Sequence, residues 1–395
     1  MKEGWEKKKL GDCFSYIKNG ANIKQEKDAG GLPITRIETL SGGVFNRDRM
    51  GYANIDDNGK YDSFILNNGD LLLSHINSKA YIGRTVLYEK EGSEKIIHGM
   101  NLLRLIPIGQ LLCSKFFFYH TLCDTFKAYI ARIRKDAVNQ SSIAISDLKN
   151  IPIPVPPLSV QESIVSELDM LSGIISKHKA LQEEYDRLEQ SIFYDMFGDP
   201  VTNEKGWEVK KLEEVCEKIT DGTHDTPERL TEGVKFITGK HIRPGFIDYE
   251  NSDYVTEEVH KVIYTRCNPE YGDVLYTNIG ANLANAAMNI VHYEFSMKNV
   301  ALLKLKKEKL DGMMLSFYLN NSKMKDKIIN NYSNGGAQKF LSLKSIALIP
   351  VFIPPLSLQQ SFADKISAIE QMKAKNKAAQ EEAEMLFNER MAYYF

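Results

Sequence analysis

The stretch IPVPPLSVQES at residues 153–163 returns as VFIPPLSLQQS at residues 351–361, 198 positions later. Proline lacks an N–H group and fixes φ, so the Pro-Pro pair ends any strand that precedes it. Ser159 with Glu162, and Ser357 with Gln360, fit the S-x-x-[EQ] pattern of a capping box, which satisfies free amides at the start of a helix. Each copy therefore predicts the end of a strand and, directly after it, the start of a helix.

The proline phrase is one of several ordered matches between the two halves of the chain. The others pair GWEKKKLGD with GWEVKKLEE, LPITR with KFITG, NGDLLLS with YGDVLYT, NLLRL with ALLKL, and LQEEYDRL with AQEEAEML. Their offsets drift only between 198 and 203 residues, which indicates a tandem repeat. In each half, short apolar runs between Gly, Asn and Asp predict strands and turns, and a helical stretch follows them at 114–133 and 311–330.

After each proline phrase, apolar residues recur at steps of three and four and so predict a long amphipathic helix. The first is expected to end near Gly198 and Pro200. Lys373, Lys375, Asn376 and Lys377 interrupt the second stripe. The candidate helix-pairing residues are Val160, Ile164, Leu168, Leu171, Ile175, Leu181, Leu188, Phe362, Ile366, Ile369 and Leu386.

Helices this long exceed what one domain of about 150 residues covers, so each is predicted to pair with the other. The prediction is an α/β (α+β) fold with two tandem globular domains joined by two long antiparallel helices in pseudo-twofold arrangement. The alternative is two independent helices that dock on their own domains. The predicted boundaries are 1–157 and 201–355 for the globular domains, and 158–200 and 356–395 for the helices.

Charge is distributed unevenly along the 395 residues. Residues 1–157 hold 22 Lys+Arg and 17 Asp+Glu, a net +5, whereas residues 158–200 hold 3 and 9, a net −6. A mildly basic domain permits nucleic-acid binding without requiring it. No apolar run is long enough to span a membrane, no signal peptide is evident, and the five cysteines form no C-x-x-C pair. These features predict a reduced, cytoplasmic protein.

The repeated GWE.KKL and PPLS.Q phrases, each PPLS.Q followed by a long helix, resemble the specificity subunit of a type I restriction-modification system. ITDGTHDTPE at 219–228, GDVLYT at 272–277 and GGAQKFLSL at 335–343 are similar to motifs of its target-recognition domains. The first half departs from the pattern, because IKNGANIKQE at 17–26 replaces the DGTH loop. The resemblance covers the whole chain.

What the resemblance implies is a non-catalytic DNA reader. Each recognition domain would read one half of a split target in double-stranded DNA. The paired helices would set the spacing and dock two methylation subunits, and a restriction subunit would join them. No cofactor or metal is implied.

Catalytic motifs are missing from the sequence. The nearest string to the D/N-P-P-Y/F motif of adenine methylation is NPEY at 268–271, which has glutamate in place of the second proline. GVKFITGKH at 233–241 differs from a phosphate-binding loop, because His241 stands where Ser or Thr binds magnesium. These observations favour a reader or a scaffold over an enzyme.

Base reading in the major groove uses Arg, Lys, Asn and Gln, and phosphate contacts add Ser and Thr near turns. In the first half the residues of this kind that cluster in loops are Arg36, Ser74, Asn77, Lys79, Arg84, Arg132, Arg134, Lys135, Asn139 and Gln140. In the second half they are Thr223, His224, Lys240, His241, Arg243, Thr277, Asn278, Asn282, Asn334, Gln338 and Lys339. For any one of them the alternative is a solvated side chain. For the whole chain the alternative is a protein-interaction scaffold without DNA specificity.

Overall fold

The computed structural model describes residues 4–25, 30–52, 54–138, 140–336 and 339–395. It divides into two compact units: a first unit of Met1–Lys179 with Ala378–Phe395, and a second unit of Ala180–Lys377. The boundary between the two units runs through both long helices, after Lys179 and after Lys377. The predicted recognition-domain boundaries, which set the helices apart, stay predictions.

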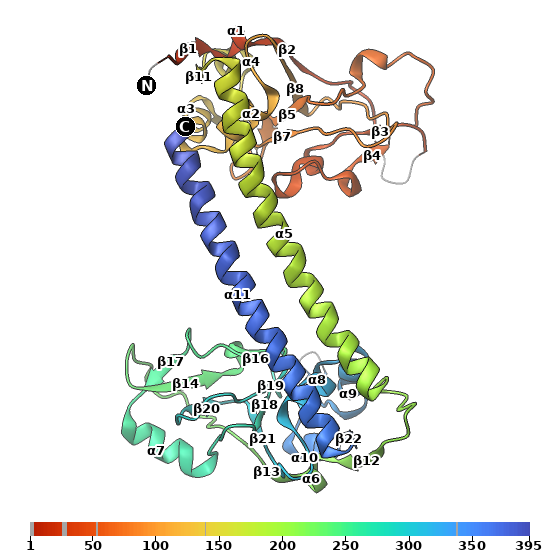
Figure 1. Cartoon of the computed structure of the whole chain (residues 1–395), viewed down its shortest axis with the longest axis vertical. Coiled ribbons are helices and arrows are strands. Elements are labelled where there is room, and N and C mark those ends of the chain that lie inside the picture. The colour runs from red at the N-terminus through yellow and green to blue at the C-terminus, as the bar shows by residue number, and fades with distance from the viewer. Residues whose placement is uncertain (1–3, 26–29, 53, 139, 337–338) are drawn as a thin grey trace. The chain divides into compact units, whose positions relative to one another are not determined.

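The first unit is built on an antiparallel sheet in the order β2-β8-β5-β7 (Figure 1). Its strands are β2 (Phe14–Asn19), β8 (Leu102–Pro107), β5 (Leu71–Ser74) and β7 (Thr85–Leu87). A two-stranded sheet pairs β1 (Glu6–Lys9) with β11 (Pro152–Val155). The other elements are α1 (Leu10–Cys13), β3 (Pro33–Ile34), η1 (Ile37–Gly43), η2 (Arg47–Arg49), β4 (Gly51–Tyr52), η3 (Asp62–Phe64), β6 (Ile76–Asn77), α2 (Ser114–Leu122), α3 (Asp124–Ile133), β9 (Lys135–Asp136), β10 (Ser141–Ser142) and α4 (Ile145–Lys149).

The second unit repeats this topology with the sheet β13-β21-β18-β19. Its strands are β13 (Cys216–Asp221), β21 (Ala301–Leu305), β18 (Val274–Tyr276) and β19 (Ala286–Met288). A second sheet, β17-β14-β20, holds β17 (Asp253–Val255), β14 (Val234–Thr238) and β20 (Ser296–Lys298). The other elements are β12 (Glu208–Lys211), α6 (Leu212–Val215), η4 (Gly239–His241), β15 (Ile242–Arg243), β16 (Phe246–Ile247), α7 (Glu257–Arg266), α8 (Gly312–Asn320), α9 (Ser322–Tyr332), α10 (Leu343–Ala347) and β22 (Pro350–Ile353).

Each predicted helical stretch of the globular parts is two helices rather than one. In the first unit the break falls at Cys123, whose backbone is extended and whose Sγ accepts a hydrogen bond from the Phe126 amide at 3.4 Å. In the second unit Asn321 does the same through its side chain, which accepts from the Met324 amide at 3.2 Å. Residues that cap a new helix therefore divide a continuous helical pattern.

Two helices of 40 and 39 residues follow the proline phrases, as predicted: α5 (Leu158–Phe197) and α11 (Leu356–Tyr394). Gly198, with φ of +81°, ends α5. Within the first unit Glu167 of α5 contacts Arg390 of α11, and Lys179 contacts Glu384. Later residues of one helix meet earlier residues of the other, so the pairing is antiparallel.

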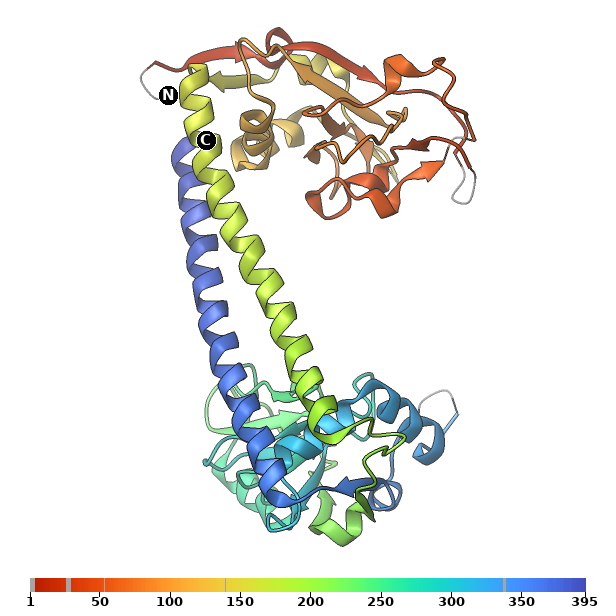
Figure 2. The same ribbon diagram turned by 45° about the vertical axis from the view of Figure 1, so that its right-hand side comes forward.

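The second unit holds the remaining halves of the same helices, also antiparallel. Phe193 and Phe197 of α5 pack against Phe362 of α11, with ring centroids 5.7 and 5.2 Å apart. In Figures 1 and 2 the start of α5 lies beside the end of α11 in the first unit, and its end lies beside the start of α11 in the second. The fold class predicted from the sequence, two tandem α/β domains with two long antiparallel helices, is confirmed.

The residues of the predicted helix seam differ in their burial. Ile164, Leu168 and Leu171 are buried in the first unit, and Phe362, Ile366 and Ile369 in the second, while Ile175 is half-buried. Val160, Leu181, Leu188 and Leu386 keep 37%, 38%, 44% and 40% of their surface exposed, so their place in the seam stays a prediction. Next to Leu188, the polar Glu189 is buried and Tyr185 is half-buried.

The predicted capping box is also wrong. α5 begins at Leu158, and the amides of Val160 and Gln161 donate to the Pro157 carbonyl at 2.9 and 3.1 Å. α11 begins in the same way after Pro355. The serine thus lies inside the first helical turn instead of preceding it, because the second proline already provides the helix start.

The residue of the phrase that makes the structural contacts is the glutamine after the serine. Gln161 is fully buried; its Oε1 accepts from the Cys113 amide at 2.8 Å, and its Nε2 donates to the carbonyls of Leu111 and Pro156 at 2.9 and 2.8 Å. Gln359 is likewise fully buried. It accepts from the Asp311 amide at 2.8 Å and donates to the carbonyls of Lys309 and Pro354 at 3.0 and 2.8 Å. We call these two sets of contacts the glutamine clamps.

We predict that Gln359→Ala lowers the free energy of unfolding by about 2–4 kcal/mol, because three backbone groups, of which the Pro354 carbonyl is fully buried, lose their hydrogen bonds to the Gln359 side chain. The matched control is Gln360→Ala, the same change at the adjacent exposed position, with an expected effect within about 0.5 kcal/mol. Urea unfolding of both variants provides the measurement. If Gln360→Ala lowered the free energy of unfolding more than Gln359→Ala, the result would support the capping box instead of the glutamine clamp.

Candidate nucleic-acid interface

A three-stranded sheet in the first unit gathers two loops that are far apart in the sequence. Its order is β6-β10-β9, with Ser142 opposite Ile76 and Ser141 opposite both Asn77 and Asp136. The loop 74–84 and the segment 132–142, both candidates from the sequence, therefore lie together. We call residues 76–84 and 132–142, leaving out 139, the first-unit edge.

Asp136 is the centre of the charge network on this edge. Its carboxylate accepts from Arg134 Nε at 2.6 Å and Nη2 at 3.2 Å, and from Ser141 Oγ at 2.7 Å. These contacts, chiefly that with Arg134, lower the pKa of Asp136. Arg134 is mostly buried and bound to Asp136, whereas the Lys79 side chain is 73% exposed and lies 3.9 Å from the same carboxylate. Arg134 thus holds the loop together, and Lys79 is accessible.

The other polar candidates on the edge and beside it are exposed to different degrees. Arg84 lies over the ring of Tyr81 at 4.5 Å and donates to the Leu40 carbonyl at 3.3 Å, which ties the edge to η1. Arg36, at the start of η1, lies 3.4 Å from Glu38. Arg132, Lys135 and Gln140 are exposed. A pocket of about 380 Å³ lies between Lys79–Thr85 and α3.

The second unit forms the same arrangement from equivalent segments. Phe340 is opposite Ile279 and Asn334 in isolated bridges, and the Leu341 amide donates to the Asn278 carbonyl at 2.8 Å. We call residues 278–282, 334 and 339–341 the second-unit edge. Its exposed groups differ in kind from those of the first: Asn334 and Lys339 are exposed, and Ile279 and Phe340 keep 43% and 39% of their surface.

The remaining candidates of the second half lie near η4. Asn282 Nδ2 donates to the Gly239 carbonyl at 3.2 Å, which links the edge to η4. Lys240 pairs with Asp253 at 3.1 Å, and Arg243 is exposed. The DGTH loop lies close to η4 because both pair with the same strand. Lys298 of β20 is the β-bridge partner of Thr223 in the loop and of Thr238, which directly precedes η4.

His224 is held by its own loop and by Asn299, which follows β20. Its ring lies 2.9 Å from Asp221 Oδ2 and 2.9 Å from Asn299 Oδ1. The first unit has a parallel bridge between Ala21 and Gly99 in this place, although its sequence lacks DGTH. The same pairing of backbone segments, Ala21 with Gly99 and Thr223 with Lys298, therefore carries different side chains in the two units.

Three candidates are corrected by their burial. Ser74 and Thr277 have no exposed surface, and each closes its own turn: Ser74 Oγ accepts from Asn77 Nδ2 at 3.0 Å, and Thr277 Oγ1 donates to the Asn282 carbonyl. His241 is 3% exposed, and its Nδ1 accepts from the Thr238 amide at 2.9 Å. Burial lowers the pKa of His241, which favours the neutral ring. These residues shape the loops and do not present their side chains to a ligand.

Asn139 and Gln338 lie outside the described residues. Tyr81, Ile279 and Phe340 were missed, although they are exposed on the two edges. Exposure of an apolar or aromatic residue has no signal in the sequence alone, since the same residue types fill the core.

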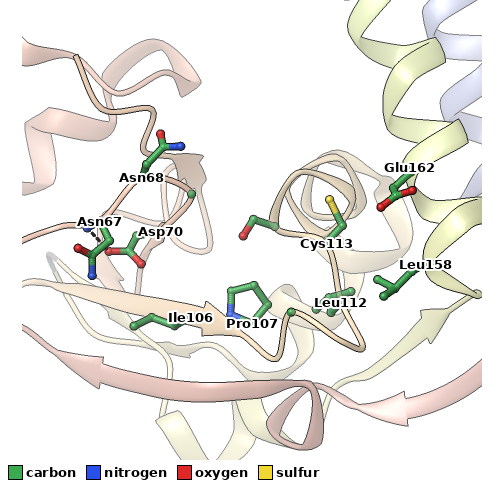
Figure 3. A pocket seen from close by; sticks show the side chains of 12 residues that line it. Asn67, Asn68, Asp70, Ile106, Pro107, Leu112, Cys113, Leu158 and Glu162 are labelled. Carbon is green, nitrogen blue, oxygen red and sulfur yellow. Dashed lines mark hydrogen bonds between the residues drawn. The ribbon is translucent and has the colours of Figure 1, made fainter. Parts of the chain in front are cut away.

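Another pocket of the first unit, of about 420 Å³, is lined by no residue of the first-unit edge. Figure 3 shows it from close by. It lies between the turn before β5, the end of β8 and the start of α5, and Asp70 and Cys113 line it. Asp70 is already bound to Arg104 at 2.6 Å and to the Asn67 amide at 2.7 Å. In the second unit the Lys307 side chain lies beside the equivalent turn at Gly272.

Two other kinds of site are absent from the described part of the chain. Among these residues no group of three or more His, Cys, Asp or Glu could hold a metal ion. None of the helices there is both long and apolar enough to cross a membrane.

Comparison with known proteins gives consistent matches over two thirds or more of the chain. The family model described as "Type I restriction modification DNA specificity domain" matches twice, at residues 2–185 and 204–385. The putative type I restriction enzyme MjaX specificity subunit of Methanocaldococcus jannaschii is 32% identical, over 94% of this chain and 88% of that protein. The EcoKI specificity subunit of Escherichia coli is 23% identical, over 67% of this chain and 59% of that protein.

Solved structures share the fold. The type I restriction-modification S subunit from M. genitalium aligns with a TM-score of 0.62 at 16% identity, over 98% of this chain and 95% of that one. A chain from a structure of type I restriction-modification complex assembly aligns with a TM-score of 0.54 at 17% identity, over 99% of this chain and 97% of that one.

We predict that Arg134→Ala speeds amide hydrogen exchange at Ser141 and Ser142, because Asp136 loses the bidentate partner that orders β9 against β10. Lys135→Ala removes a neighbouring exposed cation and serves as the control, with exchange at these amides unchanged. Equal exchange in both variants would show that the Arg134–Asp136 pair does not order the edge.

Proposed function

Because the chain belongs to the family of type I restriction-modification DNA specificity subunits, we propose that it is the non-catalytic subunit that reads a bipartite target in double-stranded DNA. Residues 1–157 and 201–355 are then the two target-recognition domains, and 158–200 and 356–395 are the helices that set the spacing. Two methylation subunits and a restriction subunit are the partners, and the chain itself binds no cofactor.

The observation that carries the proposal is the recurrence of the edge. In each unit, two polar loops that are far apart in the sequence pair with each other: residues 76–77 with 141–142, and Ile279 with Phe340. The tandem repeat makes these pairs of segments equivalent. A non-catalytic reader needs such a surface in each half, made of side chains that reach bases and phosphates. The residues proposed to contact DNA are Arg36, Asn77, Lys79, Arg84, Arg132, Lys135, Gln140, Thr223, His224, Lys240, Arg243, Asn278, Asn282, Asn334 and Lys339.

The two edges suit different parts of DNA recognition. The first carries accessible cations, such as Lys79, Arg132 and Lys135, which neutralise phosphates. The second carries Asn278 and Asn334 beside exposed Ile279 and Phe340. Amide side chains pair with adenine edges, and apolar groups contact the thymine methyl. The first domain is therefore proposed to supply more of the electrostatic affinity.

Methylome sequencing of cells that express the chain with its methylation subunit tests the function directly. The expected result is one split motif with a methylated adenine in each half. Exchange of residues 201–355 for the matching segment of a relative then changes one half of the motif only. An assembled, active complex that methylates no split motif would refute the reader and favour a scaffold.

Salt dependence separates the roles of the two edges. We expect Lys79→Ala with Arg132→Ala to reduce the slope of log K against log salt by roughly 0.9 for each phosphate that is no longer neutralised, because fewer counterions are released. Asn278→Ala should leave the slope unchanged and weaken only specific binding, by about 1–3 kcal/mol. Competition binding by the assembled methylation complex gives both quantities.

Lys149→Ala, an exposed cation on α4 outside both edges, is the control for the slope. If Lys149→Ala reduced the slope as much as Lys79→Ala with Arg132→Ala, the assignment of the first-unit edge would be overturned. A changed slope for Asn278→Ala would overturn the division of roles.

A further inference from the structure

The tip of the first-unit edge carries an apolar side chain that is almost fully exposed. Val138 keeps 99% of its surface exposed, against 75% for Val262, an exposed valine on α7. A valine in such a position contributes little to folding, because apolar side chains stabilise a fold by being buried. Apolar residues with part of their surface exposed are common on proteins. An apolar side chain that lies almost entirely in water is therefore a candidate for contact with a ligand.

Val138 lies in the turn of a short hairpin. β9 pairs with β10, with Ser141 opposite Asp136. The Ala137 amide donates to the Gln140 carbonyl at 2.9 Å, so the pairing continues up to the turn. Turns favour Gly, Pro, Asn, Asp and Ser, and a β-branched apolar residue is not among these types. Local turn chemistry therefore does not account for a valine at this position.

The hairpin is held at its base. Arg134 Nε donates to the carboxylate of Asp136 at 2.6 Å. β10 also pairs with β6, and the Ile143 amide that follows donates to the His75 carbonyl at 2.9 Å. These contacts fix the hairpin to the rest of the unit, so Val138 is presented from an ordered support. A group on an ordered support loses less conformational entropy when it binds.

Exposed cations surround the hairpin. Arg132 and Lys135 are exposed, and the Lys79 side chain is 73% exposed. Cations in such positions suit the phosphates on either side of a DNA groove. An apolar tip on a cationic base thus fits a ligand in which an apolar group lies recessed between two rows of anions.

The major groove of B-DNA has this combination. It is about 12 Å wide and admits a two-stranded β-ribbon. Its base edges present hydrogen-bond donors and acceptors together with one apolar group, the 5-methyl group of thymine. The minor groove is only about 6 Å wide and presents no methyl group. Among the four standard bases, an apolar side chain at the end of a ribbon therefore finds an apolar partner only beside thymine, in the major groove.

The second unit has a glycine at the equivalent place. Gln140 and Gln338 are equivalent at an offset of 198, so Gly336 stands for Val138. A Cβ atom at Gly336 would meet nothing within 4 Å, so packing does not require glycine there. The two domains therefore differ in what this position displays, as domains that read different bases would.

We propose that Val138 is a specificity-determining residue that contacts the 5-methyl group of a thymine in the half-site read by the first domain. The inference rests on the proposed function, because it requires that the first-unit edge faces DNA. It goes further by assigning one side chain to one chemical group of the target. The half-site of the first domain must then contain at least one T·A pair.

The test removes that methyl group from the DNA. The half-site of the first domain is the one that exchange of residues 201–355 leaves unchanged. Each thymine on either strand of it is replaced in turn by uracil, which keeps the hydrogen-bonding groups of thymine and lacks only the 5-methyl group. Competition binding by the assembled methylation complex at fixed salt measures the affinity. For the wild-type chain, uracil at one position is expected to weaken binding about fourfold, the effect of losing one buried methyl-sized group.

Val138→Ala is expected to weaken binding to the thymine duplex by a similar factor and to remove the effect of uracil at that position. The slope of log K against log salt should stay that of the wild type, because no phosphate contact is lost. Amide hydrogen exchange at Ser141 and Ser142 should also stay unchanged, since the hairpin leaves Val138 almost uncovered. Val262→Ala, the same change at an exposed position outside both edges, is the matched control and should keep the full uracil effect.

Specific binding in which no uracil effect depends on Val138 would overturn the inference and leave the DNA reader standing. An equal loss from Val138→Ala on thymine and uracil duplexes would do the same, because the side chain would then contact another part of the DNA. A half-site of the first domain without any T·A pair would also contradict it. A complex that prefers no DNA duplex would refute the reader, and the inference with it.

Discussion

The start of the long helix in each unit is held by one buried side chain, the glutamine of the proline phrase. Gln161 and Gln359 each join the end of the last strand, the approach to a helix of the globular part and the first turn of the long helix. Three hydrogen bonds from one side chain fix three backbone segments at once. Because the long helix starts at this clamp, its direction relative to the sheet follows from it.

A second buried contact recurs inside each sheet. Asp70 pairs with Arg104 at 2.6 Å in the first unit, and Asp273 with Lys304 at 3.2 Å in the second. Each acid also accepts an amide from the turn before its strand. The strand that follows this turn leads to the candidate edge, β5 toward Ser74 and β18 toward Thr277. The contact thereby anchors the loop whose side chains are proposed to meet DNA.

The two units keep this framework and vary what it displays. The first-unit edge is organised by Arg134 and Asp136 and exposes cations, whereas the second-unit edge exposes amide and apolar side chains. The long helices vary in the same manner, with an ion pair at one seam position in each unit. Shared backbone contacts with different side chains are what a chain with two distinct recognition domains requires.

The sequence by itself determined the tandem repeat, the strand ends, the two long helices and the loops rich in polar residues. Those features depend on local chemistry, namely proline geometry, apolar periodicity and turn residues, which can be read along the chain. Tertiary structure alone decided that Gln161 and not Ser159 makes the contacts at the helix start. It also decided that Glu189 and not Leu188 is buried on α5, and that Ser74 and Thr277 are buried. Burial and partner choice depend on residues distant in sequence, so no local pattern specifies them.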